Sequence, residues 1–302
     1  MIWILGAVLA IVCSLAVALL IAIRINGAAV LDRVDRITGG SREVELLEQA
    51  RFGPGVRQVL DVYGTAANAS EPRPVLLFLH GGGWNSGDPA DYGFIGRAFA
   101  PEGFVVVTAG YRLHPEAVFP AMLEDTASAI AWTRVNIARL GGDPSRIVLA
   151  GHSAGAYDVV QVALEERWLA ASGLQPAGVI GLSGPYDFYP FDKPSSEAAF
   201  GSVGAGAESQ PINHVRADAP PMLLIHGEDD ALVKPRNSRA LAAALGDAGA
   251  PVETKFYPGF DHNAPLISLA SPWRRSRDVD DAMIAFARRV TTVSVPVQQA
   301  TD

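Results

Sequence analysis

The stretch Ile147-Val148-Leu149-Ala150-Gly151-His152-Ser153-Ala154-Gly155 decides the fold, because it joins a short apolar run to a Gly-x-Ser-x-Gly pentapeptide. The apolar run is typical of a buried strand, and a helix-compatible run of small residues follows Ser153. A serine on a sharp strand-to-helix turn has strained backbone geometry, so the residues two positions before and after it must lack bulk. Both are glycine here. The pattern predicts that the Ser153 hydroxyl projects above a sheet, where a helix N-terminus favours negative charge.

Short apolar runs alternate with longer helical patterns on both sides of this stretch. The runs predict strands at Val75 to Leu79, Phe104 to Thr108, Ile147 to Ala150, Val179 to Leu182, Met222 to Ile225 and Val252 to Tyr257. Helices are expected over Pro120 to Leu140, after Ser153, and over Pro235 to Ala248. This alternation predicts an α/β fold with a mostly parallel central sheet flanked by helices, in which ligands gather at the carboxyl ends of the strands.

The rest of the chain divides around this core. Period-two alternation in Val56 to Tyr63 predicts an early antiparallel hairpin strand. Residues 185–220 carry no long period and predict a small cap insertion, since a structureless connection of that length is uncommon unless it is a lid or binding loop. We therefore expect a catalytic domain over 56–292, preceded by an approach segment over 25–55 and followed by a tail over 293–302.

A second glycine-rich signal follows the predicted strand Val75 to Leu79. It reads His80-Gly81-Gly82-Gly83-Trp84. Consecutive glycines let the backbone approach a ligand closely and turn its N–H groups inward, as a tetrahedral oxyanion requires. A strand-HGGG loop upstream of a strand-GxSxG turn is a joint pattern that chance rarely supplies.

Together these motifs resemble those of α/β hydrolases of the carboxylesterase type, close to the hormone-sensitive-lipase-like and arylformamidase-like esterases. The resemblance extends over roughly residues 56 to 290. It includes HGGGW, GYRLHPE from Gly110 with Phe119-Pro120 and Asp125, GGDPSRIVLAGHSAG from Gly141, and HGEDD from His226. HGGGW, with Trp84 in the fifth place, is shared with formamidases and leaves the substrate class open. The resemblance implies an α/β-hydrolase fold and a nucleophile, acid and histidine in that chain order.

That chain order limits which histidine can be the general base. Only His214, His226 and His262 follow Ser153. If the acid follows the strand Met222 to Ile225, it is Glu228, Asp229 or Asp230, and the sole histidine left is His262, in a turn-rich loop. The family spacing HG-x-x-D-x-x-V implies Asp230, with Asp187 as the rival position.

The expected roles follow from serine-hydrolase chemistry. His262 takes the Ser153 proton, and Asp230 fixes the imidazole tautomer. The backbone N–H groups of Gly82, Gly83 and Ala154 are the expected oxyanion donors. Aromatic residues of the HGGGW loop and the cap could wall a substrate pocket; the candidates are Trp84, Phe188 and Tyr189.

Composition excludes several other classes of function. The chain has 302 residues and a formal net charge of −8, from 24 Lys plus Arg against 32 Asp plus Glu. No basic cluster is present that would gather phosphates, so nucleic acid is not an expected partner. The only cysteine is Cys13, which excludes disulfides and thiolate metal sites in the rest of the chain. No metal and no cofactor are expected, and the oligomeric state is open.

The first residues form a separate apolar segment. Ile2 to Ile23 carries no charge and would extend about 33 Å as a helix, close to the roughly 30 Å of a bilayer core. We expect residues 1–24 to be an uncleaved transmembrane anchor in a bacterial-type inner membrane. Gly27-Ala28-Ala29 keeps open a cleaved signal, which would make the protein periplasmic or secreted. The arginines that follow the span favour a cytoplasmic domain.

These observations predict a serine esterase that acts on small to medium acyl or aryl esters and is held at a membrane. An arylformamidase-like amide hydrolase is the alternative in the same mechanistic class. A non-catalytic, membrane-tethered binding module on a hydrolase fold is the alternative from another class. Such a module usually lacks one of the three catalytic side chains, and all three are present here.

Overall fold

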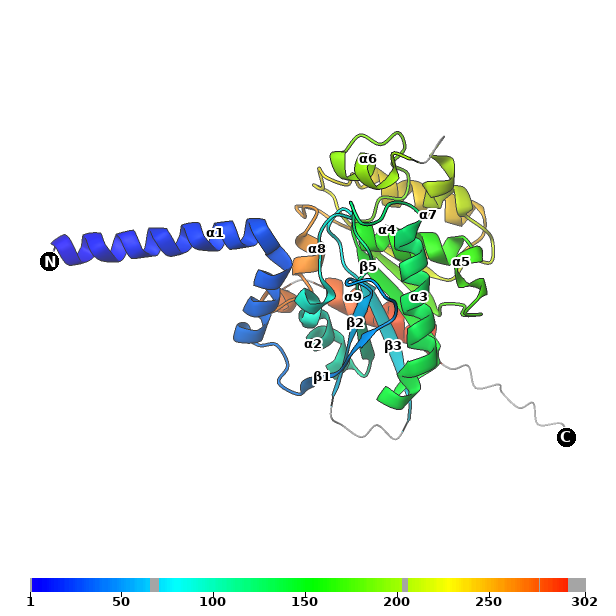
Figure 1. Cartoon of the computed structure of the whole chain (residues 1–302), viewed down its shortest axis with the longest axis horizontal. Coiled ribbons are helices and arrows are strands. Elements are labelled where there is room, and N and C mark those ends of the chain that lie inside the picture. The colour runs from blue at the N-terminus through cyan, green and yellow to red at the C-terminus, as the bar shows by residue number, and fades with distance from the viewer. Residues whose placement is uncertain (1, 66–70, 203–205, 277, 293–302) are drawn as a thin grey trace.

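The structure, a computed structural model, describes residues 2–65, 71–202, 206–276 and 278–292. Of the side chains in these ranges, those of residues 2–12, 15, 275 and 276 are outside the description, and the expected tail 293–302 lies outside the described residues altogether. Figure 1 shows a sheet-centred body from which the first half of helix α1 (Ile2–Thr38) extends to one side.

One eight-stranded sheet organises the described residues. The strands follow the order β1-β2-β4-β3-β5-β6-β7-β8. Strand β2 pairs antiparallel with both β1 and β4, and all the other pairs are parallel. The bounds are β1 (Val44–Arg51), β2 (Val59–Thr65), β3 (Arg73–Leu79), β4 (Val105–Ala109), β5 (Gly142–His152), β6 (Gly178–Leu182), β7 (Met222–Gly227) and β8 (Val252–Tyr257). The predicted mostly parallel sheet is confirmed.

Helices cover both faces of the sheet because successive strand residues point to opposite sides. In β3, Val75, Leu77 and Leu79 join one buried cluster, whereas Leu76 and Phe78 join the other. The first cluster includes residues of α3 (Ala121–Asn136), α4 (Ala154–Leu164), α5 (Arg167–Ala170) and α7 (Arg236–Asp247). The second includes residues of α2 (Gly93–Phe99), α8 (Ala264–Ile267) and α9 (Val279–Thr291). The sheet is therefore the middle layer of three (Figure 1).

The sheet begins earlier than the sequence predicts. Strand β1 lies inside the segment 25–55, which we expected to be an approach segment, and it is the hairpin partner of β2. Its side chains alternate only partly between half-buried and exposed, because β1 is an edge strand. An edge strand carries charge and lacks the continuous apolar run by which buried strands are recognised.

The expected cap segment, 185–220, lies between β6 and β7. Its described residues form helix α6 (Pro194–Phe200) and two short 3-10 helices, Ala207–Ser209 and Pro211–His214. Figure 1 places α6 above the edge of the sheet where β5 leads into α4. This segment therefore stands over the end of the strand that precedes Ser153.

Helix α1 has two parts, separated by a kink at Asn26, whose φ is −150° and ψ is 83°. The second part is tied to the domain by buried ion pairs: Arg97 pairs with Asp35 at 2.6 Å and also with Asp32, and Arg274 pairs with Asp35 at 2.9 Å. Breaking such a buried pair typically costs about 3–5 kcal/mol, because one charge is left without its partner. Residues 27–38 are therefore a fixed part of the folded body.

The expected anchor, Ile2 to Ile23, coincides with the first part of α1, and about half of its side chains are outside the description. Among the residues that are described, no helix combines the length and the apolar character needed to cross a bilayer. The anchor stays a prediction.

Candidate active site

The turn that carries Ser153 has little room for side chains. Strand β5 ends at His152, helix α4 begins at Ala154, and Ser153 between them has a φ of 54° and a ψ of −118°. A Cβ added at Gly151 would lie 2.3 Å from the carbonyl oxygen of Gly155, and one added at Gly155 would lie 2.3 Å from that of Leu79. Both contacts are with backbone, which cannot yield as a flexible side chain can. The two glycines let the helix start close against the sheet.

This packing predicts that Gly155→Ala destabilises the fold. The added methyl would clash with backbone of β3, and we expect a loss of at least about 2 kcal/mol in the free energy of unfolding, measured by urea denaturation. The matched control is Gly246→Ala in α7, where an added Cβ meets nothing within 4 Å. Alanine there should stabilise by about 0.5 kcal/mol, since it is the better helix former. Equal stability of the two variants would contradict the packing argument.

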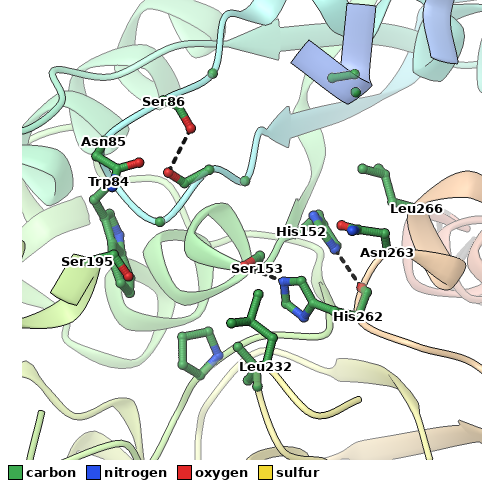
Figure 2. Close-up of a pocket in the computed structure, with 18 of the residues that line it drawn as sticks. Trp84, Asn85, Ser86, His152, Ser153, Ser195, Leu232, His262, Asn263 and Leu266 are labelled. Atoms are coloured by element: carbon green, nitrogen blue, oxygen red, sulfur yellow. Dashed lines mark hydrogen bonds between the residues drawn. The ribbon is translucent and has the colours of Figure 1, made fainter. Parts of the chain in front are cut away.

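A line of hydrogen bonds joins three side chains from separate elements. The Ser153 hydroxyl lies 2.9 Å from His262 Nε2, and His262 Nδ1 lies 2.8 Å from Asp230 Oδ2. Ser153 follows β5, Asp230 follows β7, and His262 follows β8. The carboxyl ends of these strands meet at one edge of the sheet, so residues far apart in sequence come together. Figure 2 shows the Ser153 and His262 side chains next to each other.

The surroundings of Asp230 keep its carboxyl group ionised. Burial alone would raise its pKa, but hydrogen bonds from His226 and His262 outweigh burial and hold the pKa of Asp230 well below its usual value. Oδ1 accepts the backbone N–H groups of Leu232 and Val233 at 2.9 and 2.8 Å. An ionised carboxylate can only accept, so His262 Nδ1 carries the proton and its Nε2 is free to accept from Ser153.

The other candidate acids lie elsewhere. Asp187 pairs with Arg236 at 3.1 Å and is partly exposed. Glu228 pairs with Arg239 at 2.7 Å. The backbone N–H of Asp229 donates to Phe260 in the turn. Only Asp230, among the acids considered from the sequence, lies within hydrogen-bond distance of the His262 ring.

The HGGGW loop approaches Ser153 from the end of β3. Gly82 and Gly83 both have positive φ, +120° and +57°, and a Cβ at Gly82 would lie 2.1 Å from the Ser86 carbonyl oxygen. Within the described part of the chain, the N–H groups of Gly82 and Gly83 donate to no protein acceptor. Ala154 is the first residue of α4, where helical N–H groups have no intrahelical partner. The three expected oxyanion donors are therefore available to a ligand.

Trp84, the last residue of the HGGGW loop, packs its side chain into the protein interior. The indole N–H donates to Asp158 Oδ1 at 3.2 Å, and the ring packs against Tyr157, Phe188 and Phe200. Burial raises the pKa of Asp158 well above its usual value, which favours the neutral form of this carboxyl group. Asp158 was not a candidate from the sequence, because its role depends on contact with a residue 74 positions away. Phe188 is partly buried in this cluster, whereas Tyr189 is 47% exposed at its margin.

A cavity of about 1260 Å³ lies over Ser153 and His262. Ser153 and His262 line it, as do the candidates Gly82, Gly83, Trp84, Phe188 and Tyr189. Figure 2 shows Trp84 and Ser195 on one side of Ser153, and Asn263 and Leu266 on the other. The cavity therefore extends in two directions from the serine hydroxyl.

Two more histidines support this arrangement. The His152 ring donates from Nε2 to the backbone carbonyl of His262 at 3.0 Å, which ties the turn of Ser153 to the loop of His262. His226 Nε2 lies 2.7 Å from the Val233 carbonyl and 3.2 Å from Asp230. Sequence reasoning assigned neither histidine to this support; the four-residue spacing of His226 and Asp230 is its only signal.

The buried imidazole of His80 is expected to make the stability of the protein depend on pH. Burial lowers its pKa to about 4, whereas an unfolded histidine titrates near 6.5. The unfolded chain then binds the extra proton first, so the stabilisation is present above about pH 6.5 and is lost as pH falls through 4. His80→Gln removes this titration, and its free energy of unfolding should fall less steeply, by up to about 1.4 kcal/mol per pH unit.

The measurement is the difference between the two proteins in urea unfolding from pH 7 to pH 4. Only this difference between the two proteins is predicted, and not the stability curve of either one. Burial raises the pKa of Asp280 to about 6, so protonation of Asp280 stabilises the folded state as pH falls, opposite to the effect of His80. Parallel stability curves would contradict the assignment of a neutral, buried His80.

Among the described residues, no group of three His, Cys, Asp or Glu side chains could hold a metal ion. The chemistry available at the site is that of a hydroxyl, an imidazole, a carboxylate and backbone N–H groups.

The fold and these side chains are those of an α/β hydrolase, and comparison with known proteins supports this class. The BD-FAE family model matches residues 60–245, and the chain belongs to this family. Esterase LipQ of Mycobacterium tuberculosis is 33% identical over 258 residues, which are 78% of this chain and 60% of that protein. A probable isoprenylcysteine α-carbonyl methylesterase of Arabidopsis thaliana, ICMEL1, is 29% identical over 75% of this chain and 52% of its own length.

The chain spans between about half and 60% of the length of these curated relatives. Among solved structures, esterase B of Lactobacillus rhamnosis superposes with a TM-score of 0.74 at 20% identity, covering 91% of this chain and 95% of that one. A truncated carbohydrate esterase from gut microbiota gives a TM-score of 0.71 at 20% identity, covering 84% and 99%. The predicted α/β-hydrolase fold is confirmed.

Proposed function

We propose that this protein hydrolyses small to medium acyl or aryl carboxylic esters through an acyl-enzyme formed on Ser153. The observation that carries the proposal is the unbroken line of hydrogen bonds from Ser153 through His262 to Asp230. Each of the three groups lies at the distance at which a nucleophile, its base and the group that orients the base operate.

In acylation, Ser153 Oγ forms a bond to the ester carbonyl carbon while its proton passes to His262 Nε2. Asp230, ionised and fully hydrogen-bonded, stabilises the imidazolium. The negative charge that develops on the carbonyl oxygen is held by the N–H groups of Gly82, Gly83 and Ala154, each worth about 100-fold to 1000-fold in turnover. The bond to the alcohol oxygen then breaks, and His262 gives its proton to the departing alcohol.

In deacylation, His262 takes a proton from a water molecule as that water attacks the acyl carbon. The bond between the acyl carbon and Ser153 Oγ breaks, the carboxylic acid leaves, and the proton returns to the serine. The same three side chains serve both half-reactions, so the cycle consumes one water and needs no other reactant.

Two assays test the proposal. A fluorophosphonate should label Ser153, identified by peptide mass spectrometry, and p-nitrophenyl acetate should be hydrolysed with saturation kinetics. A protein that resists the fluorophosphonate and turns over no ester would instead support the alternative of a non-catalytic binding module on a hydrolase fold.

Formamide hydrolysis by an arylformamidase-like mechanism uses the same side chains, and the HGGGW loop permits it. We favour esters because the similar curated proteins are named as esterases. Parallel assays on p-nitrophenyl butyrate and N-formylkynurenine separate the two substrates. A value of kcat/KM for the formamide far above that for the ester would overturn the choice.

We also propose that the apolar segment Ile2 to Ile23 holds the protein at a membrane. The proposal is supported by its uncharged sequence and by the exposed apolar side chains in the described part of α1. Cell fractionation with a carbonate wash tests attachment, and N-terminal sequencing of the mature protein tests cleavage near Gly27. Release of the full-length chain by the wash would overturn the proposal.

A further inference from the structure

The catalytic cavity is larger than a short ester requires. At about 1260 Å³ it exceeds the roughly 300–1,000 Å³ typical of pockets for drug-sized ligands. On the side of Trp84 and Phe188 its wall is aromatic. The opposite side, beyond Asn263 and Leu266, is bordered by α1, the blue helix near those residues in Figure 2. The proposed ester hydrolysis assigns no role to this second side.

Contacts on both sides of the kink at Asn26 fix the position of helix α1 beside the cavity. The Asn26 side chain donates from Nδ2 to Asp91 Oδ2 at 2.6 Å and accepts the N–H of Ala29 at 3.0 Å, so it caps the second part of the helix. The ion pairs of Asp32 and Asp35 with Arg97 fix that second part to the domain. The direction in which the first part leaves the domain is therefore set by contacts on both sides of Asn26.

The first part of α1 presents aliphatic side chains to the cavity. Leu19, Ile23 and Ile25 line it together with Leu266 and Ile267. Leu19 and Ile23 are four residues apart and therefore lie on one face of the helix. They are 51% and 47% exposed, so each offers apolar surface that a bound chain could cover. Leu20 and Ile21, which are 66% and 53% exposed, belong to the same helix but do not line the cavity.

We propose that the cavity-facing side chains of α1, Leu19 and Ile23, with Ile25 at the mouth, bind the acyl chain of medium-length esters. The N-terminal helix is then a specificity determinant of the hydrolase, and this rests on the proposed function. An aliphatic wall suits a flexible acyl chain, whereas the aromatic wall across the cavity suits a flat leaving group. Each methylene buried against α1 contributes about fourfold to binding.

The test compares two double variants of the full-length protein that remove the same side chains from the same helix. L19Q/I23Q alters the cavity wall, and L20Q/I21Q is the matched control. Glutamine keeps similar size and helix propensity, so both variants lose equal apolar surface without a helix-breaking residue. All four positions lie in the segment proposed to hold the protein at a membrane, so any effect on attachment is common to both variants. The readout is the ratio of kcat/KM for p-nitrophenyl octanoate to that for p-nitrophenyl acetate, with both substrates below the concentration at which they aggregate.

L19Q/I23Q should lower this ratio at least about tenfold, as expected from exposing two or more methylenes of the chain. Its hydrolysis of the acetate ester, whose acyl group has no chain to pack against α1, should stay within twofold of the unaltered protein, and L20Q/I21Q should change neither value. An unchanged ratio in L19Q/I23Q, or an equal fall in both variants, would overturn the role of α1 while leaving esterase activity intact. Failure of the unaltered protein to hydrolyse either ester would overturn the proposed function and the acyl site together.

Discussion

Replacing Ser153 by alanine is expected to lower kcat/KM for p-nitrophenyl esters by at least about 10⁴-fold without unfolding the protein. The substitution removes the only hydroxyl within hydrogen-bond distance of His262 Nε2 among the described residues. It adds no bulk to the turn, so circular dichroism and the urea midpoint should match those of the unaltered chain. His262→Ala should cause a loss of similar size, because the serine then has no base to take its proton.

Ser195→Ala is the control for this prediction. Ser195 also lines the cavity, on the Trp84 side of Ser153 in Figure 2, and its variant should keep activity within a few-fold. Fluorophosphonate labelling should persist in Ser195→Ala and vanish in Ser153→Ala. Labelling that persists in Ser153→Ala and disappears in Ser195→Ala would show that the nucleophile lies on the cap.

Asp230→Asn is expected to lower kcat by about 10⁴-fold while leaving a measurable remnant. The amide can donate to His262 Nδ1, which favours the tautomer that carries its proton on Nε2 and cannot take one from Ser153. The remnant comes from the oxyanion donors and from substrate binding, which this substitution does not touch.

Asp187→Asn is the matched control for the acid. Asp187 is partly exposed and paired with Arg236, and exposed pairs of this kind contribute little to stability. We expect kcat within about twofold of the unaltered protein. A large loss in Asp187→Asn, with Asp230→Asn still active, would show that the acid follows β6 and not β7.

The lowered pKa of Asp230 also affects the stability of the folded protein at low pH. Its pKa is lowered in the folded state, so the stabilisation it provides is present above about pH 4, the unfolded value, and is lost as pH falls below that point. The Asp230→Asn variant should therefore lose less stability than the unaltered protein on acidification below pH 4.

The sequence predicts the parallel strands well because they are buried on both faces and read as continuous apolar runs. Strand β8 has the expected bounds, and β3 and β7 each extend two residues beyond the expected bounds at one end. The edge strand β1 and the short helix α2 were not predicted. Strand β1 carries charge among its apolar residues, and α2 is a seven-residue helix that contains two glycines.

The residues of the site also differ in how well the sequence predicts them. Ser153 is predicted by its local motif, and His262 by the small number of histidines that follow it. The choice of Asp230 over its neighbours needed the family spacing, because three acidic residues in one turn cannot be ranked by sequence chemistry. The support from Asp158 and His226, and the wall formed by α1, depend on contacts between distant segments and leave no periodic signal.

The hydrogen bond from the His152 ring to the His262 carbonyl means that the residue before Ser153 holds the loop that carries His262. The reactive groups are therefore assembled before any substrate arrives, and no ligand-triggered closure is needed to align them. Rapid mixing with excess p-nitrophenyl ester should release the first equivalent of nitrophenol without a lag. Selectivity among esters should then reside in how well each one fills the space above the serine, and not in whether it can provoke a change of shape.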